Sequence, residues 1–270
     1  MSYILQGSDY RAKRLLDMAN LIRSPRAPNE WTRSQLREYR VKIGRATRAT
    51  QFFEPHNPPR PFPRDQLIPA FYDPLIQHID QDSNAMDGFL IGVTNRPDDE
   101  KYLDHFICGL LGFLANHANA NSVAPHGNVE VAEQKSTPLL MCGFVHRAKT
   151  NVTITCGGRI VLVEESKVEQ TVEKTEPQLL AEMIAAFQFN ERTNPALIEQ
   201  TMYGIIMRGL YPHLYKANIT RELSDSVKQG IEPNTDTRLV RYTPVSPRLD
   251  KFQGMLDHHQ RKRIMHCGSW

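Results

Sequence analysis

The chain has 270 residues, of which 40% are hydrophobic and 23% are charged, and its formal net charge is +3. This length favours one α/β core with an extension over two large domains. The four cysteines lie far apart without C-x-x-C spacing, which argues against a disulfide framework or a cysteine zinc site. No apolar run is long enough to span a membrane, and the N-terminus lacks the pattern of a signal peptide. We therefore expect an intracellular protein, cytoplasmic or nuclear, in a reducing compartment and without a membrane partner.

The N-terminal segment combines many basic residues with apolar residues at helical spacing. Residues 9–24 and 29–43 are predicted as amphipathic helices. In the second, Arg37, Arg40 and Lys42 are candidate nucleic-acid contacts, because a basic helical face can follow a phosphate backbone. A solvated helix surface is the alternative interpretation.

Prolines dominate the next segment. Residues 54–74 contain seven of them, which excludes a helix and indicates an extended connector. His78, Asp82 and Asp87 follow, and they favour turn chemistry over a metal cluster because no metal-ligand spacing repeats there. Residues 102–117 are apolar nearly all round and are predicted as a helix that packs against a sheet. The same apolar surface leaves open a structural subunit of a larger assembly.

Short strands are predicted after a polar loop at residues 118–136. Residues 138–146 and 151–155 are strand-like, and a glycine-rich turn separates them from a third run at residues 159–168. After Arg159, that third run has four consecutive apolar residues without polar alternation, which is typical of a strand covered on both faces. We therefore expect it to be central.

Glu165 and Lys167 end this predicted central strand. Because side chains alternate along a strand, the carboxylate and the ammonium should lie on the same face. Carboxylate oxygens suit a hard divalent cation, and a neighbouring lysine can orient a water or stabilise charge on a phosphate. An ordinary salt bridge at a strand end is the alternative.

The following segments are strongly patterned. Residues 177–189 have apolar residues at helical spacing, residues 201–209 form a short apolar run closed by glycine, and residues 210–217 are predicted as its hairpin partner. One mixed sheet is expected from strands near 139–146, 151–156, 159–165 and 201–207. The helix should cross over between the last two strands and make them parallel neighbours.

The order of a strand with Glu-x-Lys, a helix, a strand, a glycine turn and an aromatic strand resembles the PD-(D/E)XK superfamily of nucleases. The resemblance covers roughly residues 137–220 and is greatest to the branch seen in fungal and restriction-associated proteins. It implies an α/β, restriction-endonuclease-like fold with a central mixed sheet flanked by helices. It also implies metal-dependent hydrolysis of phosphodiester bonds in DNA or RNA, with Mg²⁺ or Mn²⁺ as cofactor.

One position departs from the pattern of that superfamily. A metal-binding aspartate is expected at the start of the hairpin's second strand, where this chain has Asn151. An amide oxygen carries no charge and binds a divalent ion more weakly than a carboxylate. The resemblance thus implies Glu165, Lys167 and Asn151 as catalytic residues and Glu165, Asn151 and an upstream acid, Glu133 or Glu130, as metal ligands. The alternative is a catalytically decayed module that binds nucleic acid, a protein partner or a second copy of itself.

The C-terminal part is less regular. Residues 221–227 are predicted as a short helix, prolines interrupt residues 229–248, and residues 248–265 are predicted as a final helix. Its basic cluster at residues 258–263 suits a nucleic-acid contact or a nuclear localisation signal, and equally a solvated helix. The predicted organisation is a basic helical N-terminal extension (1–54), a proline-rich connector (55–76), a nuclease-like α/β core (77–227) and a C-terminal irregular segment with a helix (228–270).

Overall fold

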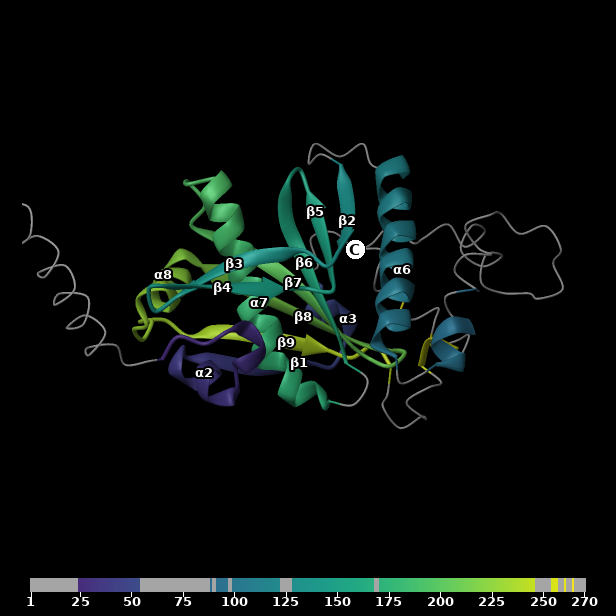
Figure 1. Ribbon diagram of the computed structural model, residues 1–270, viewed down its shortest axis with the longest axis horizontal. Helices are drawn as coiled ribbons and strands as arrows, with labels where there is room; N and C mark the ends of the chain where they lie inside the picture. Colours follow the sequence, from purple (N-terminus) through teal and green to yellow (C-terminus); the bar gives the residue numbers. More distant parts are fainter. Residues whose placement is uncertain are drawn as a thin grey trace, which may run out of the picture.

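The structure is a computed structural model that describes residues 24–53, 88, 91–96, 99–121, 128–167, 170–245, 254–256, 260 and 264. These residues form a seven-stranded mixed sheet flanked by helices, and a separate two-stranded sheet (Figure 1). The elements are η1 (Pro28–Glu30), α2 (Arg33–Glu38), β1 (Val41–Ala46), α3 (Ala49–Phe52), α6 (Glu100–Asn121), β2 (Val129–Glu133), β3 (Ser136–Met141), β4 (Phe144–Lys149), β5 (Val152–Cys156), β6 (Arg159–Lys167), α7 (Val172–Thr193), β7 (Glu199–Arg208), β8 (Tyr211–Thr220), α8 (Arg221–Gln229), β9 (Thr237–Tyr242) and η2 (Gly254–Leu256). The expected α/β class with a mixed sheet between helices is confirmed.

Strand β6, which carries Glu165 and Lys167, lies inside the large sheet. The strand order is β1-β9-β8-β7-β6-β5-β2, and β6 pairs antiparallel with β5 and parallel with β7. Parallel strands need a crossover between them, and α7 provides it. The central position of β6, its parallel neighbour and the intervening helix agree with the prediction.

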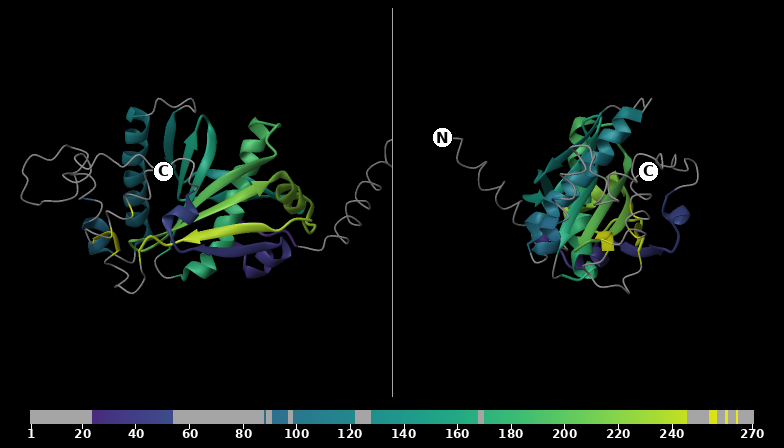
Figure 2. Two further views of the ribbon diagram at one scale, coloured as in Figure 1. Left: turned by 180° about the vertical axis from the view of Figure 1, so that it is seen from behind. Right: turned by 90° about the vertical axis from the view of Figure 1, so that its right-hand side faces the viewer.

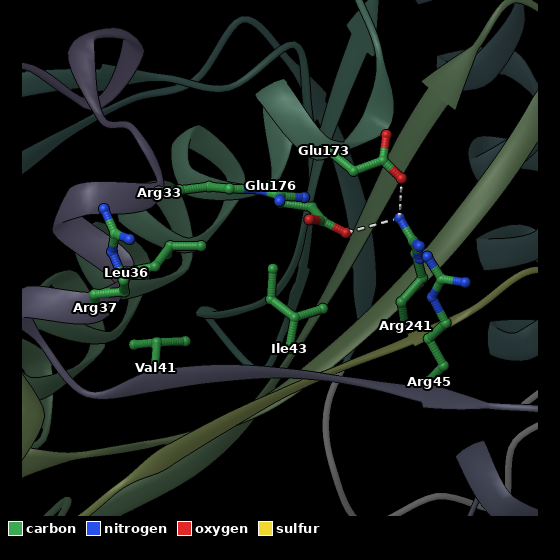
Figure 3. Close-up of a pocket in the computed structure, with 9 residues that line it drawn as sticks. All are labelled: Arg33, Leu36, Arg37, Val41, Ile43, Arg45, Glu173, Glu176 and Arg241. Carbon is green, nitrogen blue, oxygen red and sulfur yellow. Dashed lines mark hydrogen bonds and ion pairs between the residues drawn. The ribbon is translucent and has the colours of Figure 1, made fainter.

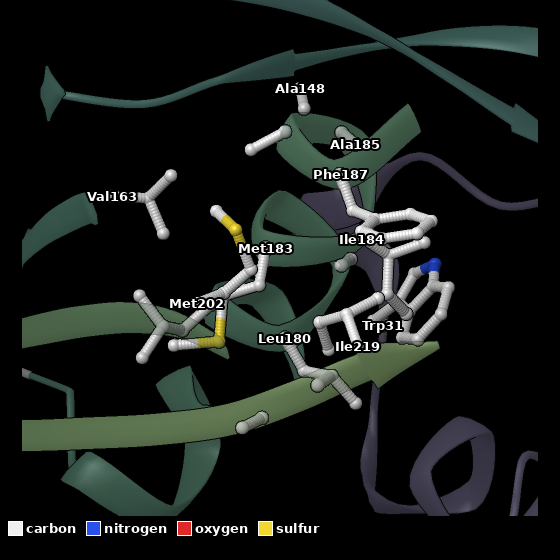
Figure 4. Packing of buried hydrophobic residues seen from close by; sticks show 14 of the residues in the cluster. Trp31, Ala148, Val163, Leu180, Met183, Ile184, Ala185, Phe187, Met202 and Ile219 are labelled. Atoms are coloured by element: carbon white, nitrogen blue, oxygen red, sulfur yellow. The ribbon is translucent and has the colours of Figure 1, made fainter. Parts of the chain in front are cut away.

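The two faces of β6 contact different apolar clusters. Val163 is fully buried with α7 in one cluster, part of which is shown in Figure 4, whereas Leu162 packs with α6 in the other. Helix α7 approaches β7 closely at Gly204, where an added Cβ would lie 2.4 Å from Cε of Met183. A residue without a side chain therefore allows this contact between helix and sheet.

The predicted strand at residues 139–146 is wrong. The chain reverses at Cys142 and Gly143, whose φ angles are 51° and 77°. Strands β3 and β4 therefore form a two-residue hairpin outside the large sheet, with Met141 paired to Phe144. The hairpin packs on α7, where the Gln188 side chain accepts a hydrogen bond from the Leu140 amide (2.8 Å) and donates one to its carbonyl (3.1 Å).

The predicted helix at residues 29–43 is also largely wrong. Only Arg33–Glu38 is α-helical, Arg40 has a left-handed φ of 52°, and Val41–Ala46 is strand β1. This strand pairs in parallel with β9, almost two hundred residues later in the chain (Figure 2). Alternate side chains of β1 face α7 (Figure 3). Pairing with a distant strand has overridden the local helical pattern.

Two other strands lie where irregular chain was expected. Strand β9 occupies part of residues 229–248, and β2 occupies part of residues 118–136. Pro233 and Pro244 flank β9 rather than interrupt it. The predicted helices in α6, α7 and α8 and the β7–β8 hairpin are confirmed, and the hairpin turns at Gly209 (φ 54°).

Several predicted features lie wholly or mostly outside the described residues. They are the 9–24 helix, the proline-rich 54–74 segment, the acids Asp82 and Asp87, and the 258–263 basic cluster. Across the described ranges, no helix combines the length and the apolarity that a membrane crossing requires.

Candidate functional site

The end of β6 presents a buried carboxylate and a lysine on one face of the sheet. Glu165 is only 2% exposed, and its Oε1 lies 2.7 Å from Nζ of Lys167, as strand alternation predicted. The same ammonium lies 3.8 Å from Oε2 of Glu100 at the start of α6. The Lys167 side chain retains 18% exposure. It therefore connects the buried carboxylate to solvent.

Helix α7 adds a second buried acid to this face. Glu182 is fully buried, and Nε2 of Gln178, one turn earlier, donates a hydrogen bond of 2.9 Å to its Oε1. Burial raises the pKa of Glu182 well above its ordinary value, and the neighbouring charge of Glu165 raises it further. Burial also raises the pKa of Glu165, but Lys167 opposes this shift. Lys167 therefore favours the ionised form of Glu165, whereas burial and the charge of Glu165 favour the protonated form of Glu182.

A second acidic pair lies on the opposite face of β6. Glu164 is fully buried and accepts a hydrogen bond of 2.7 Å from Oγ of Ser166. Asp104 of α6 also interacts with Ser166, and burial raises the pKa of both carboxyl groups. The end of the central strand therefore has buried acids on both faces and one lysine.

Asn151 stands next to these acids at the start of β5. Its backbone amide donates to the carbonyl of Glu164 (3.2 Å), and the pairing of Val152 with Glu164 places it opposite Glu165 in the register. Its side-chain Nδ2, however, donates to Oδ1 of Asp104 (2.9 Å). The position expected to supply a metal-binding aspartate is thus occupied by an amide that binds an acid from α6.

The two upstream acids lie apart from Glu165. Glu133 is partly exposed on β2, and its Oε1 lies 3.2 Å from Nδ1 of His105. Glu130 is exposed on the same edge strand. Of the predicted ligands, the structure therefore places Glu165 with Lys167, Asn151 with Asp104, and Glu133 with His105.

The carboxylate oxygens at the end of β6 decide whether a metal ion could bind there. Among the described residues, three buried carboxylate oxygens have no hydrogen-bond partner, namely Oε2 of Glu164, Glu165 and Glu182. Glu164 lies on the other face from Glu165, and no three acid, histidine or cysteine side chains of the described residues are grouped to hold an ion. Magnesium, however, is commonly bound by one or two carboxylates together with waters and substrate phosphates. Glu165 and Glu182 together fit this smaller requirement.

The predicted nucleic-acid contacts are divided between two environments. Arg40 and Lys42 both bind Asp236, with 2.8 Å between Nε of Arg40 and Oδ1 of the aspartate. These two cations lower the pKa of Asp236. Arg37 is exposed and lines a cavity between α2 and β1 (Figure 3). Only one of the three basic residues is therefore without a described acidic partner.

Sequence reasoning missed Asp104, Gln178 and Glu182. A signal was present for Glu182, because it lies among apolar residues on the buried face of a strongly predicted helix, and acids are rarely buried without a partner. Asp104 gave a similar but weaker signal inside the apolar helix α6. Neither could be assigned to Glu165 or Asn151 without the packing of the helices on the sheet.

Comparison of the chain with protein-family models and with curated proteins finds no match. The three cysteines that the structure describes, Cys108, Cys142 and Cys156, are free thiols. Assignment of the site therefore depends on its geometry and its chemistry.

Proposed function

We propose that this chain is a metal-dependent nuclease of the PD-(D/E)XK type that hydrolyses phosphodiester bonds in DNA or RNA. One observation carries the proposal: the buried acids Glu164, Glu165 and Glu182 and the partly buried Asp104 gather around a single lysine at the end of the central strand. A buried carboxylate without a counter-charge costs several kcal/mol. Groups of acids with raised pKa values are characteristic of functional sites.

The topology supports the same proposal. The antiparallel pair β5–β6, the crossover by α7 and the parallel strand β7 follow the element order that the resemblance implies, whereas β2 takes the place in the sheet that was expected for residues 138–146. The Glu-x-Lys motif lies at the carboxyl end of β6, and Asn151 lies opposite Glu165.

Each residue has a defined task in this proposal. Glu165 and Glu182 would hold the metal, which when bound would polarise the scissile phosphate and acidify a water. Gln178 holds one oxygen of Glu182 and leaves the other free. Lys167 favours the ionised form of Glu165, and its partly exposed ammonium would be available to a phosphate. Ser166 holds Glu164 and steadies the strand end from the opposite face.

The second candidate is a nuclease-fold module that binds nucleic acid or a protein without cleavage. The hydrogen bond between Asn151 and Asp104 favours this second candidate. The Asn151 side chain directs an N–H donor at Asp104, where a metal-binding aspartate would present an anionic oxygen to a metal. The short contact of Lys167 with Glu165 favours it as well, because a closed ion pair needs no ligand.

A cleavage assay separates the two candidates. The full chain is incubated with double-stranded DNA, single-stranded DNA and RNA in Mg²⁺, in Mn²⁺ or in EDTA. If the chain is a nuclease, we expect cleavage only when a metal is present. Glu165→Gln should abolish cleavage, and Glu182→Gln should reduce its rate at least about a hundredfold. Glutamine is chosen because it has nearly the same size as glutamate. Glu130→Gln, the same change on the exposed edge strand, should leave the rate unchanged. If no substrate is cut with either metal while binding persists, the non-catalytic module is correct.

A further inference from the structure

A cavity of about 410 Å³ lies away from Glu165, at the other end of the sheet. Helix α2, strands β1 and β9, and the first turns of α7 line it (Figure 3). Three strands separate β1 from β6, which corresponds to roughly 19 Å between the two at ordinary strand spacing. The cavity is therefore a separate feature from the acidic strand end.

The charges that line the cavity are unequal. Four arginines face it, Arg33, Arg37, Arg45 and Arg241, against Glu173 and Glu176. Both glutamates bind Nη1 of Arg241, at 3.1 Å and 2.9 Å. Within the described part of the chain, the other three arginines form no ion pair. The cavity consequently has an excess of about two positive charges.

The register of the strands adds a second observation. Arg45 of β1 lies directly opposite Arg241 of β9, with both side chains on the α7 face. Like charges opposite one another on adjacent strands destabilise a sheet. Arg241 is neutralised by its two glutamates, and Glu176 is fixed in turn by the hydroxyl of Tyr215 (3.1 Å). Arg45 lacks such a partner among the described residues, so Arg45 is the arginine of this pair that an added anion would neutralise.

The remaining wall is apolar. Leu36, Val41 and Ile43 form this wall, and they lie between Arg37 of α2 and Arg45 of β1 (Figure 3). The volume is within the range of small-molecule sites, and here these three apolar side chains stand beside six charged ones. The guanidinium fork matches phosphate oxygens in a bidentate manner, and a phosphate monoester carries close to two negative charges.

We infer that this cavity binds a phosphate monoester attached to an apolar or planar group, the chemistry of a nucleotide. The source is either a free nucleotide or the phosphorylated end of a nucleic acid. The phosphate lies between Arg33 and Arg45, and the attached group covers Ile43 and its aliphatic neighbours. This inference is independent of the proposed nuclease activity, because binding here requires no metal.

Calorimetry on the full chain in EDTA and low salt tests the inference. The probes are adenosine 5′-monophosphate, adenosine, and a ten-nucleotide DNA with either a 5′-phosphate or a 5′-hydroxyl. Arg33→Gln and Arg45→Gln should each weaken binding of the phosphorylated probe about tenfold or more, because each removes a charged hydrogen-bond donor. Arg238→Gln is the matched control, since Arg238 is exposed on β9 on the face away from the cavity.

Each outcome decides the matter. Binding of the monophosphate but not of adenosine, lost in the two variants and kept in the control, supports a free nucleotide. Binding only of the 5′-phosphorylated DNA, with the same variant pattern, supports a nucleic-acid end. Equal binding of phosphorylated and unphosphorylated probes, equal weakening by Arg238→Gln, or no binding of any probe would overturn the inference.

Discussion

Replacing Lys167 with methionine removes the cation from the buried acids of β6 while keeping most of the side-chain volume. Lys167 contacts Glu165 at 2.7 Å, and Glu165 is 2% exposed. Breaking a buried pair by removing one partner costs about 3 kcal/mol or more, because the remaining charge is uncompensated. We therefore expect the free energy of unfolding of Lys167→Met to fall by about 3 kcal/mol at pH 8.

The loss of unfolding free energy in Lys167→Met should become larger as pH rises. Burial already raises the folded-state pKa of Glu165 above its unfolded value, and Lys167 limits this shift. Without Lys167 the folded-state pKa rises further, so the folded variant binds more protons than the unfolded chain over a wider range. Its stability then declines as pH rises through that range, by at most about 1.4 kcal/mol per pH unit. At the acidic end of that range, where Glu165 is protonated in the folded variant, the stability of the variant should approach that of the wild type.

Urea denaturation followed by circular dichroism at pH 5 and pH 8 measures both effects. Lys174→Met is the control, because it makes the same chemical change at an exposed residue of α7, away from β6. An equal loss at the two pH values, or a loss no larger than in the control, would refute the account of Glu165 as an ionised carboxylate held by Lys167.

Three further predictions follow from single contacts. Asn151→Asp places a carboxylate against Asp104, so unfolding free energy should fall at pH 7 without metal and recover with Mg²⁺, as melting temperatures would show; no recovery would argue against a metal at this site. Asn190→Ala should lower stability by about 2–3 kcal/mol in urea titrations, because the buried amide bonds the β6 backbone at 2.9 Å and 2.6 Å, and a loss below about 0.5 kcal/mol would contradict this. In duplex DNA binding, Arg37→Ala should flatten the slope of log K against log salt by about one unit, whereas Lys42→Ala should change the slope less, because Lys42 already binds Asp236. If the slope for Arg37→Ala equals that of the wild type, Arg37 belongs to a solvated surface and does not contact DNA.

Local sequence determined the central elements of this protein. The unbroken apolar run of β6, the helical spacing in α7 and the glycine-closed hairpin of β7 and β8 each contain enough periodicity to identify the element. The pairing of Glu165 with Lys167 followed from the same source, because two residues of one strand share a face whatever surrounds them.

Tertiary structure decided the edges of the sheet and the membership of the site. Strand β1 exists because β9 pairs with it, and six residues with an ambiguous pattern cannot specify a partner so distant in the chain. The hairpin of β3 and β4 depended on a Cys142–Gly143 turn within an apolar run. Asp104 and Glu182 join Asn151 and Glu165 only because α6 and α7 pack on opposite faces of β6. Helix packing against a sheet depends on many long-range contacts at once, and no local pattern encodes which acids it brings together.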